Sequence, residues 1–302
     1  MRVLLTNHSL QYVGGTEKWI YGMAQELSRL GHEVEVFTFL TGLSSEHIAE
    51  HATIVDAVKG REYDVKLINH NTCQAVARAA SGYTIYTSHG PRHPLEIPGT
   101  GADAYVGVSK EVWAKYAMMG INMEVVTNGI DLEAFAPGRP VVGPPRVLSM
   151  CKIGLAGAMV EEACAALGWR CTGVNYLSAP IWDVAPLMRE ADIVVGCGRT
   201  AIEGLASGCQ VLVFDARTNR SPRADGWINE QNIEHLRQCN FSTRCYGMEW
   251  TVADLKRALV QYPGAAEWQR EWAERHADVR EKVQTYLELA EVRELTRELV
   301  AA

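Results

Sequence analysis

The chain has 302 residues, of which 47% are hydrophobic and 22% are charged, and its formal net charge is −7. This length suits two domains of ordinary size, and the composition is typical of a globular protein. The acidic balance argues against a broadly basic face for binding nucleic acid. The sequence carries neither a signal-peptide pattern nor a long apolar run, so we expect a cytoplasmic protein with no transmembrane segment.

The eight cysteines form no Cys-x-x-Cys pair, and several of them stand beside apolar strand residues. We therefore expect reduced, buried thiols rather than a zinc site or a disulfide framework. These cysteines are Cys73, Cys151, Cys164, Cys171, Cys197, Cys209, Cys239 and Cys245.

In the first half of the chain, strand patterns alternate with helix patterns. An apolar strand at 2–6 is followed by a glycine loop at 13–17 and by an amphipathic helix that stops at Gly31. Further strands are expected at 33–39, 53–55, 65–68, 83–87 and 104–108. This alternation predicts a parallel sheet with helices on both faces.

The run 137–145 contains four prolines and two glycines, which is typical of an interdomain linker. The alternation then resumes, with strands at 146–150, 170–174, 193–195 and 211–214 and helices at 157–167, 182–190 and 200–207. From about residue 265 the pattern is that of a long charged helix. We predict a first domain at 1–138, a second at 146–265 and a C-terminal helical segment at 266–302.

An ordered series of signals lies between the two halves. In chain order it consists of a strand at 106–108, a helix cap at Ser109, a helix at 110–119, a strand at 123–127, the turn Asn128-Gly129-Ile130-Asp131, and then Phe135 and Pro137. The series resembles the N-terminal domain of retaining glycosyltransferases of the GT-B fold, in particular glycosyltransferase family 4. The resemblance covers nearly the whole chain, although its specific motifs are confined to a few stretches.

The resemblance implies the GT-B fold, with two Rossmann-like parallel-sheet domains, a cleft between them and a C-terminal crossover helix that returns to the N-terminal domain. It makes 1–138 the acceptor-side domain and 146–265 the domain that binds the nucleotide sugar. It also implies transfer of a sugar from a nucleotide diphosphate sugar, with retention at the anomeric carbon. The nucleotide sugar is then a substrate, and no separate cofactor is expected. A coiled-coil tail is the other interpretation of the last segment, but its heptad pattern is irregular.

The stretch 192–208 combines an apolar strand, a glycine loop and a helix. Backbone N–H groups at the start of such a helix bind diphosphate, and the glycine at Gly198 permits close approach. Arg199 and Thr200 are candidates for contacting the phosphates. Glu203, about one turn into the helix, is placed to accept the ribose hydroxyls. The plain alternative is a strand–helix turn that binds no ligand.

This stretch also resembles the second half of the Glu-x7-Glu signature of the family, in which Glu203 matches the ribose-binding glutamate. The first glutamate is absent, because Val195 stands at its position. Gln210 replaces the proline that usually follows the small-residue helix. The half of the motif that binds the nucleotide is therefore retained, and the half that usually contacts the sugar is altered.

Residues from three further stretches of the chain complete the predicted donor site. Gly14 and Gly15 resemble the N-terminal glycine loop of the family, which faces the donor phosphate. His89 ends an apolar strand, where ligands of open parallel sheets gather, and the family often has a donor-sugar histidine there. Asn128 belongs to the turn that carries the resemblance. For each site the structural alternative is an ordinary loop residue or a histidine bonded to the backbone.

Lys152 follows the first strand of the second domain, where the family places an arginine that stabilises the departing diphosphate. The second base of that pair is missing, and Arg199 is the candidate to replace it. We thus assign His89, Lys152 and Arg199 to catalysis, with a solvated lysine as the alternative for Lys152.

No Asp-x-Asp sequence and no zinc-type spacing occurs, so we expect metal-independent chemistry and no metal site. The absence of a P-loop motif argues against an ordinary P-loop kinase. The basic stretch Arg217, Arg220 and Arg223 precedes Asp225-Gly226-Trp227, which is a candidate loop over the nucleotide or acceptor. These arginines form either a solvated loop or a site for an anionic acceptor.

The leading hypothesis is a glycosyltransferase, a hexosyl- or related transferase, that acts on an unknown acceptor. Loss of the first glutamate and of the second base motivates one alternative, a non-catalytic nucleotide-sugar-binding protein of the same fold. The other alternative is a GT-B sugar-nucleotide epimerase. Turnover of labelled donor, with and without acceptor, distinguishes the three.

Overall fold

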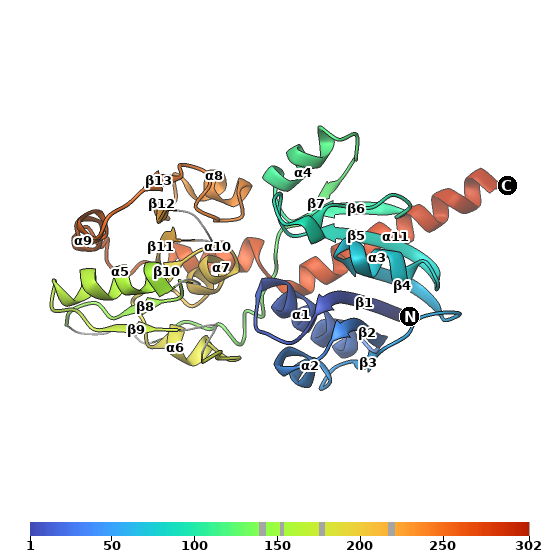
Figure 1. Cartoon of the computed structure of the whole chain (residues 1–302), viewed down its shortest axis with the longest axis horizontal. Helices are drawn as coiled ribbons and strands as arrows, with labels where there is room; N and C mark the ends of the chain where they lie inside the picture. The colour runs from blue at the N-terminus through green and yellow to red at the C-terminus, as the bar shows by residue number, and fades with distance from the viewer. Residues whose placement is uncertain (139–142, 152–153, 175–178, 217–220, 302) are drawn as a thin grey trace. The chain divides into compact units, whose positions relative to one another are not determined.

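The computed structural model describes residues 1–138, 143–151, 154–174, 179–216 and 221–301. The chain forms two compact units (Figure 1). Unit 1 consists of Met1–Gly129 and Val279–Ala302, and unit 2 consists of Ile130–Asp278. The predicted linker residues 139–142 lie outside the described residues, and residues 130–138 pack within unit 2.

Unit 1 is built on a seven-stranded sheet with the strand order β3-β2-β1-β4-β5-β6-β7, and all of its pairs are parallel. Its strands are β1 (Arg2–Ser9), β2 (Glu33–Leu40), β3 (Thr53–Val55), β4 (Glu62–Asn69), β5 (Ser81–Ser88), β6 (Ala104–Gly107) and β7 (Glu124–Val125). Its helices are α1 (Gly15–Arg29), α2 (Leu43–Ile48), α3 (Asn71–Ala77), the short 3₁₀ helix η1 (Pro94–Glu96), α4 (Lys110–Ala117) and α11 (Val279–Ala301). The strands predicted in this half are confirmed, within a few residues at their ends.

Alternation along the strands divides the apolar residues of unit 1 between two cores. Val3 and Leu5 of β1 face a cluster that includes residues of α1 and α11, whereas Leu4 belongs to a cluster that includes residues of α3. The sheet is therefore covered on both faces, as a parallel sheet requires. At the end of α1, Gly31 takes a left-handed φ of 83°, which explains why the helix stops there.

Unit 2 contains a six-stranded sheet with the strand order β13-β12-β11-β10-β8-β9. Its strands are β8 (Val147–Ser149), β9 (Cys171–Gly173), β10 (Ile193–Gly196), β11 (Gln210–Asp215), β12 (Arg223–Trp227) and β13 (Met248–Glu249). Its helices are α5 (Gly154–Ala165), α6 (Ala185–Arg189), α7 (Arg199–Ala206), α8 (Ile233–Gln238), α9 (Val252–Val260) and α10 (Trp268–His276). One face of the sheet packs with α7 and α10, and the other packs with α5 and α9.

The candidate loop Asp225-Gly226-Trp227 is instead part of strand β12, which pairs antiparallel with β11. The unit 2 sheet is thus parallel in its central part and antiparallel at one edge, where β13 also joins β12. Asp225 is buried, and its carboxylate accepts the backbone N–H groups of Cys245, Tyr246 and Gly247 at 3.3, 2.8 and 2.9 Å. This carboxylate therefore holds the following loop in place.

The expectation that every cysteine is a reduced thiol is wrong for one pair, because Cys239 and Cys245 form a disulfide. Asn240, Phe241 and Thr243 between them take positive φ angles of 51°, 49° and 60°, so the chain reverses direction within a few residues. The two Cα atoms consequently lie 6.0 Å apart, within the usual range for a disulfide. Such a local reversal leaves no Cys-x-x-Cys signature in the sequence.

The long helical pattern near the C-terminus is divided into α10, in unit 2, and α11, in unit 1. In Figure 1, α11 is the red helix that leads to the end labelled C. Tyr286 of α11 is 1% exposed; its hydroxyl lies 3.1 Å from that of Thr87 in β5, and its ring lies 5.6 Å from that of Trp19 in α1. Within the described part of the chain, no helix combines the length and hydropathy needed to cross a bilayer.

Truncating Tyr286 tests whether α11 is an integral part of unit 1. Because its side chain is enclosed by α1 and β5, we expect Tyr286→Ala to lower the free energy of unfolding by ~3–5 kcal/mol, as for other large buried aromatic residues. Tyr286→Phe removes only the hydroxyl and is expected to cost about 1 kcal/mol. Denaturant unfolding measures both, and equal, small losses would show that α11 adds little to this core.

Candidate functional site

Three neighbouring strands of unit 1 end in polar residues at the same edge of the sheet. β1 ends with Asn7-His8 before Ser9, β4 leads into Asn69-His70, and β5 leads into His89. Thr6 pairs with Ile68, and Asn69 pairs with Thr87, so the three ends are level. Carboxyl ends of parallel strands are where open α/β sheets bind their ligands.

Hydrogen bonds connect these strand ends to η1. The Nε2 atom of His89 lies 3.0 Å from Oδ1 of Asn69, and the backbone N–H of His89 donates to Glu96 at 2.6 Å. His70 Nε2 lies 3.6 Å from the other Glu96 oxygen, while its Nδ1 accepts the backbone N–H of His8 at 3.1 Å. His70 also has a positive φ of 67°, which is strained for a non-glycine residue and is common at functional sites.

The electrostatics of this edge favour a charged carboxylate and an uncharged imidazole. Burial raises the pKa of Glu96, but His70 and His89 outweigh that effect, so its pKa lies below the ordinary value. Burial, and then the neighbouring His70, lower the pKa of His8. Near neutral pH, Glu96 is therefore ionised and His8 is neutral.

The predicted glycine loop lies beside this cluster. Gly14 precedes α1, and Gly15 is its first residue; a Cβ on Gly14 would collide with the carboxylate of Glu17. That carboxylate accepts a hydrogen bond from Nδ2 of Asn7 at 3.4 Å. The Trp19 ring of α1 lies 5.3 Å from the ring of His89. The structure thus brings Gly14, Gly15 and His89 to one edge of unit 1.

In unit 2, the predicted phosphate loop joins β10 to α7. Gly198 is the N-cap residue of α7 and has a φ of 66° and a ψ of −131°, which only glycine adopts readily. Its N–H group donates to the carbonyl of Phe241 at 2.7 Å. Gly204 lets α7 approach the sheet, because a Cβ there would lie 3.0 Å from Val211 and 3.1 Å from Val194.

Arg199 and Glu203 contact each other across one turn of α7. Arg199 Nε lies 2.7 Å from Glu203 Oε1, and the two side chains are 13% and 6% exposed. Thr200 is half-buried at the start of the same helix. Arg199, which is predicted to bind phosphate, and Glu203, which is predicted to bind ribose, therefore lie side by side, and both side chains are largely buried.

Other predicted residues lie elsewhere. Lys152, Arg217 and Arg220 are outside the described residues. Arg223 is on β12 and forms an exposed ion pair with Glu249 at 3.4 Å. Asn128 is buried near the end of the first segment of unit 1, and its role in donor binding remains a prediction.

Several polar residues at these strand ends were not predicted from the sequence. In unit 1 they are Asn7, His8, Asn69 and His70, together with Glu96 of η1, which accepts the backbone N–H of His89. In unit 2, Asp215 ends β11 with only 2% exposure and accepts hydrogen bonds from Ala216 N and Cys197 Sγ at 2.8 and 3.4 Å. The repeated Asn-His dipeptide after two apolar strand patterns was the available signal.

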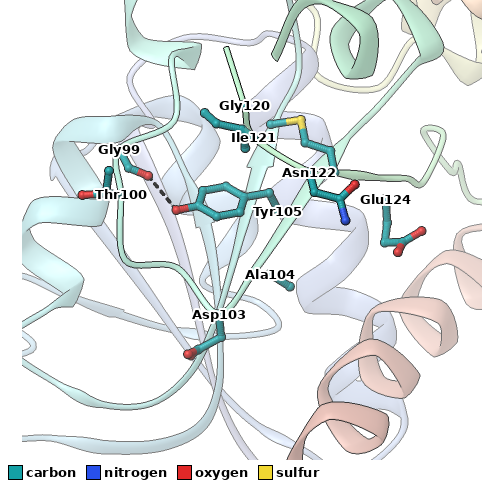
Figure 2. Close-up of a pocket in the computed structure, with 10 residues that line it drawn as sticks. Gly99, Thr100, Asp103, Ala104, Tyr105, Gly120, Ile121, Asn122 and Glu124 are labelled. Carbon is teal, nitrogen blue, oxygen red and sulfur yellow. Dashed lines mark hydrogen bonds between the residues drawn. The ribbon is translucent and has the colours of Figure 1, made fainter. Parts of the chain in front are cut away.

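A pocket of about 390 Å³ lies at the opposite, amino end of the unit 1 sheet (Figure 2). Its lining residues precede or begin β6 and β7, and the Tyr105 hydroxyl donates to the carbonyl of Gly99 at 2.9 Å. Of the predicted site residues that the structure describes, none lines this pocket. Its lining residues are Gly99, Thr100, Asp103, Ala104, Tyr105, Gly120, Ile121, Asn122, Met123 and Glu124.

Comparison with solved structures identifies the fold. The chain is similar to Anabaena Alr3699/HepE, solved in complex with UDP and glucose, with a TM-score of 0.68 and 13% identity over 97% of this chain and 100% of that one. It is also similar to a glycosyltransferase from Rickettsia africae ESF-5, with a TM-score of 0.62 and 14% identity over 96% and 97% of the two chains. A putative UDP-N-acetylglucosamine 2-epimerase from Listeria monocytogenes shares the architecture, with a TM-score of 0.55 and 13% identity over 95% and 94%.

No protein-family model matches the sequence, and no curated protein matches it. At these identities the structural likeness shows the fold alone. That fold is the GT-B fold, with two Rossmann-like units, which the sequence analysis predicted.

Replacing Glu96 tests the electrostatic cluster in unit 1. Because its pKa is lowered in the folded protein, the ionised carboxyl stabilises the fold above its ordinary pKa of 4.5, and this contribution is lost as the pH falls through the lowered value. At pH 7 we expect Glu96→Gln to lower the free energy of unfolding by ~1.5–3 kcal/mol. The difference from the native protein should shrink as the pH falls below 4.5.

Thermal and denaturant unfolding across this pH range provide the measurement. Glu50→Gln is the matched control, because its carboxyl is in the same unit and its side chain is 61% exposed. A stability difference for Glu96→Gln that stays constant with pH would contradict the interpretation.

Proposed function

We propose that the protein is a glycosyltransferase that moves a sugar from a nucleotide diphosphate sugar to an acceptor, with retention and without a metal ion. The observation that supports this most is the GT-B fold together with the loop and helix of unit 2, in which Gly198, Arg199, Thr200 and Glu203 follow a buried strand. The structural neighbours include glycosyltransferases, and HepE was solved with UDP and glucose.

On this proposal, unit 2 binds the nucleotide. The N-terminus of α7 and the Arg199 guanidinium offset the charge of the diphosphate. Glu203 accepts hydrogen bonds from the ribose hydroxyls, for which its second carboxylate oxygen remains after the contact of Oε1 with Arg199. Lys152 is proposed as a further cation for the leaving group, and Asn128, Gly14 and Gly15 as donor-binding residues.

In the transfer step, an acceptor oxygen forms a bond to the anomeric carbon on the face from which the diphosphate departs, while the bond from that carbon to the diphosphate oxygen breaks. The nucleoside diphosphate leaves with the bonding electrons, and its departing oxygen takes up the proton of the acceptor hydroxyl. His89 is proposed to bind the transferred sugar through its imidazole, which Asn69 orients at 3.0 Å. Cationic and helix N-terminal groups stabilise the charge that develops on the leaving group.

A sugar-nucleotide epimerase is the second candidate, because a putative epimerase shares the fold. Incubating UDP-sugars with the protein alone, and following the anomeric and ring protons by NMR, distinguishes the two activities. Epimerisation without acceptor would favour the epimerase, and product formation only with acceptor would favour the transferase. Binding of donor with neither activity would favour the non-catalytic alternative.

Replacing Glu203 tests the nucleotide site. We expect Glu203→Ala to weaken nucleotide binding by ~1.5–3 kcal/mol, the range for a charge-assisted hydrogen bond, as measured by calorimetric titration with UDP, GDP, ADP and TDP. Glu274→Ala is the matched control, because Glu274 makes the same type of ion pair with Arg270, at 2.7 Å, on α10 of the same unit. Equal nucleotide affinity in the two folded variants would exclude the assigned role of Glu203.

A second experiment tests the proposed independence from metal ions. The diphosphate charge is assigned to Arg199, Lys152 and helix N–H groups, so EDTA should leave the rate of transfer unchanged. Steady-state assays with and without the chelator measure this. A rate that EDTA abolishes and Mn²⁺ or Mg²⁺ restores would show that a metal performs this task.

A further inference from the structure

The segment 239–245, here called the disulfide loop, follows α8 in unit 2 (Figure 1). The bond between Cys239 and Cys245 closes it and fixes its ends with their Cα atoms 6.0 Å apart. Inside the loop, Phe241 and Thr243 take positive φ angles of 49° and 60°. This left-handed conformation is strained for an aromatic and for a β-branched residue, so it persists only where the surroundings enforce it.

The disulfide loop is bonded to the predicted phosphate loop. The carbonyl of Phe241 accepts the backbone N–H of Gly198, the N-cap residue of α7, at 2.7 Å. The Phe241 side chain is 1% exposed, belongs to the same apolar core as Ala201 and Ile202 of α7, and has its ring 5.8 Å from the ring of Trp272. Phe241 is thus a link between the core of unit 2 and the residue at which α7 begins.

The two ends of the disulfide loop are held in different ways. At one end, the buried carboxylate of Asp225 accepts the N–H groups of Cys245 and Tyr246 at 3.3 and 2.8 Å. At the other end, Cys239 follows α8, a helix of only six residues, and ends of short helices fray readily. The disulfide ties the weaker end to the end that Asp225 holds. Breaking it therefore frees the strained residues between them to relax.

The sulfur atoms of this pair belong to half-buried residues, unlike most other cysteines of the chain. Cys239 and Cys245 are half-buried, and Tyr246 beside them is 49% exposed. Of the free cysteines that the structure describes, Cys171 is half-buried and the others are buried. Burial also raises the pKa of Cys209, for example, which keeps that thiol unreactive near neutral pH. A dissolved thiol reagent therefore meets the disulfide before it meets the buried thiols.

We propose that the disulfide between Cys239 and Cys245 is a redox switch for nucleotide binding. In the oxidised protein it holds Phe241 against Gly198, so that the start of α7 is fixed for a diphosphate. In the reduced protein this support is released and the nucleotide binds more weakly. The inference rests on the proposed function and names the regulation of the same site.

The reductant that the switch requires is a dithiol. One thiolate of the dithiol attacks a sulfur of the Cys239–Cys245 bond, which forms a mixed disulfide and releases the other cysteine as a thiolate. The second thiol of the reagent then attacks the mixed disulfide and releases the first cysteine. In total, two electrons and two protons pass from the dithiol to the protein, which gains two thiols while the reagent becomes a cyclic disulfide.

Calorimetric titration of the full-length protein with UDP, GDP, ADP and TDP, before and after reduction with dithiothreitol, tests the proposal. We expect the nucleotide that binds the oxidised protein to bind the reduced protein about tenfold more weakly. This change corresponds to ~1.4 kcal/mol, the size of one hydrogen bond such as that from Gly198 to Phe241. Reoxidation should restore the affinity, and a thiol titration should follow the opening and closing of the disulfide.

A double variant, Cys239→Ser with Cys245→Ser, has no disulfide to reduce. It should bind nucleotide as weakly as the reduced native protein and should not respond to dithiothreitol. Cys171→Ser is the matched control, because it removes another half-buried cysteine of unit 2 and should keep both the native affinity and the full response. Equal nucleotide affinity in the oxidised and the reduced native protein would overturn the inference and leave the nucleotide site standing.

Hydrogen exchange of the Gly198 N–H, measured on the native protein in both redox states, keeps the test valid if the double variant does not fold. We expect exchange to become faster on reduction, because the acceptor at Phe241 is no longer fixed. If no nucleotide or nucleotide sugar binds in either state, the proposed function fails, and this exchange alone then judges the link. Faster exchange after reduction would support the link between the disulfide and α7, and unchanged exchange would overturn it.

Discussion

A parallel sheet brings the carboxyl ends of all its strands to one edge, and this constraint gathers the polar residues of unit 1. β1, β4 and β5 lie side by side, so side chains that are many residues apart in sequence become neighbours there. Backbone groups at such an edge no longer have strand partners, and side chains must pair them. Glu96 does so for the N–H of His89, and His70 does so for the N–H of His8. Among the residues that the structure describes, one amide atom each of Asn7 and Asn69 has no hydrogen-bond partner at this edge.

The elements that could be predicted from the sequence were those defined by local patterns. The apolar strands, the helix stop at Gly31 and the loop around Gly198 each depend on residues that are close in the chain. His89 could be placed at a strand end for the same reason. Its contact with Asn69 could not, because that contact depends on the order in which the strands pair, which periodicity does not encode.

Unit 2 shows a second limit of local patterns. β12 contains Asp225, Gly226 and Trp227, a composition typical of a loop, and it becomes a strand because β11 offers an unpaired edge. Asp225 then holds the loop that contains Cys245, and this loop reverses direction to form the disulfide with Cys239. The strand and the disulfide both arise from tertiary pairing, so neither leaves a clear signature in the sequence.

The ion pair between Arg199 and Glu203 constrains what the nucleotide site can bind. Removing one partner from a buried ion pair costs roughly 3–5 kcal/mol, because the other charge is left without compensation. A ligand that drew Arg199 away from Glu203 through phosphate alone would leave the buried Glu203 carboxylate without a compensating charge. A nucleoside diphosphate offers phosphate to Arg199 and ribose hydroxyls to Glu203, so it compensates both groups together. Under the proposed function, the pair therefore selects a nucleoside diphosphate over inorganic diphosphate.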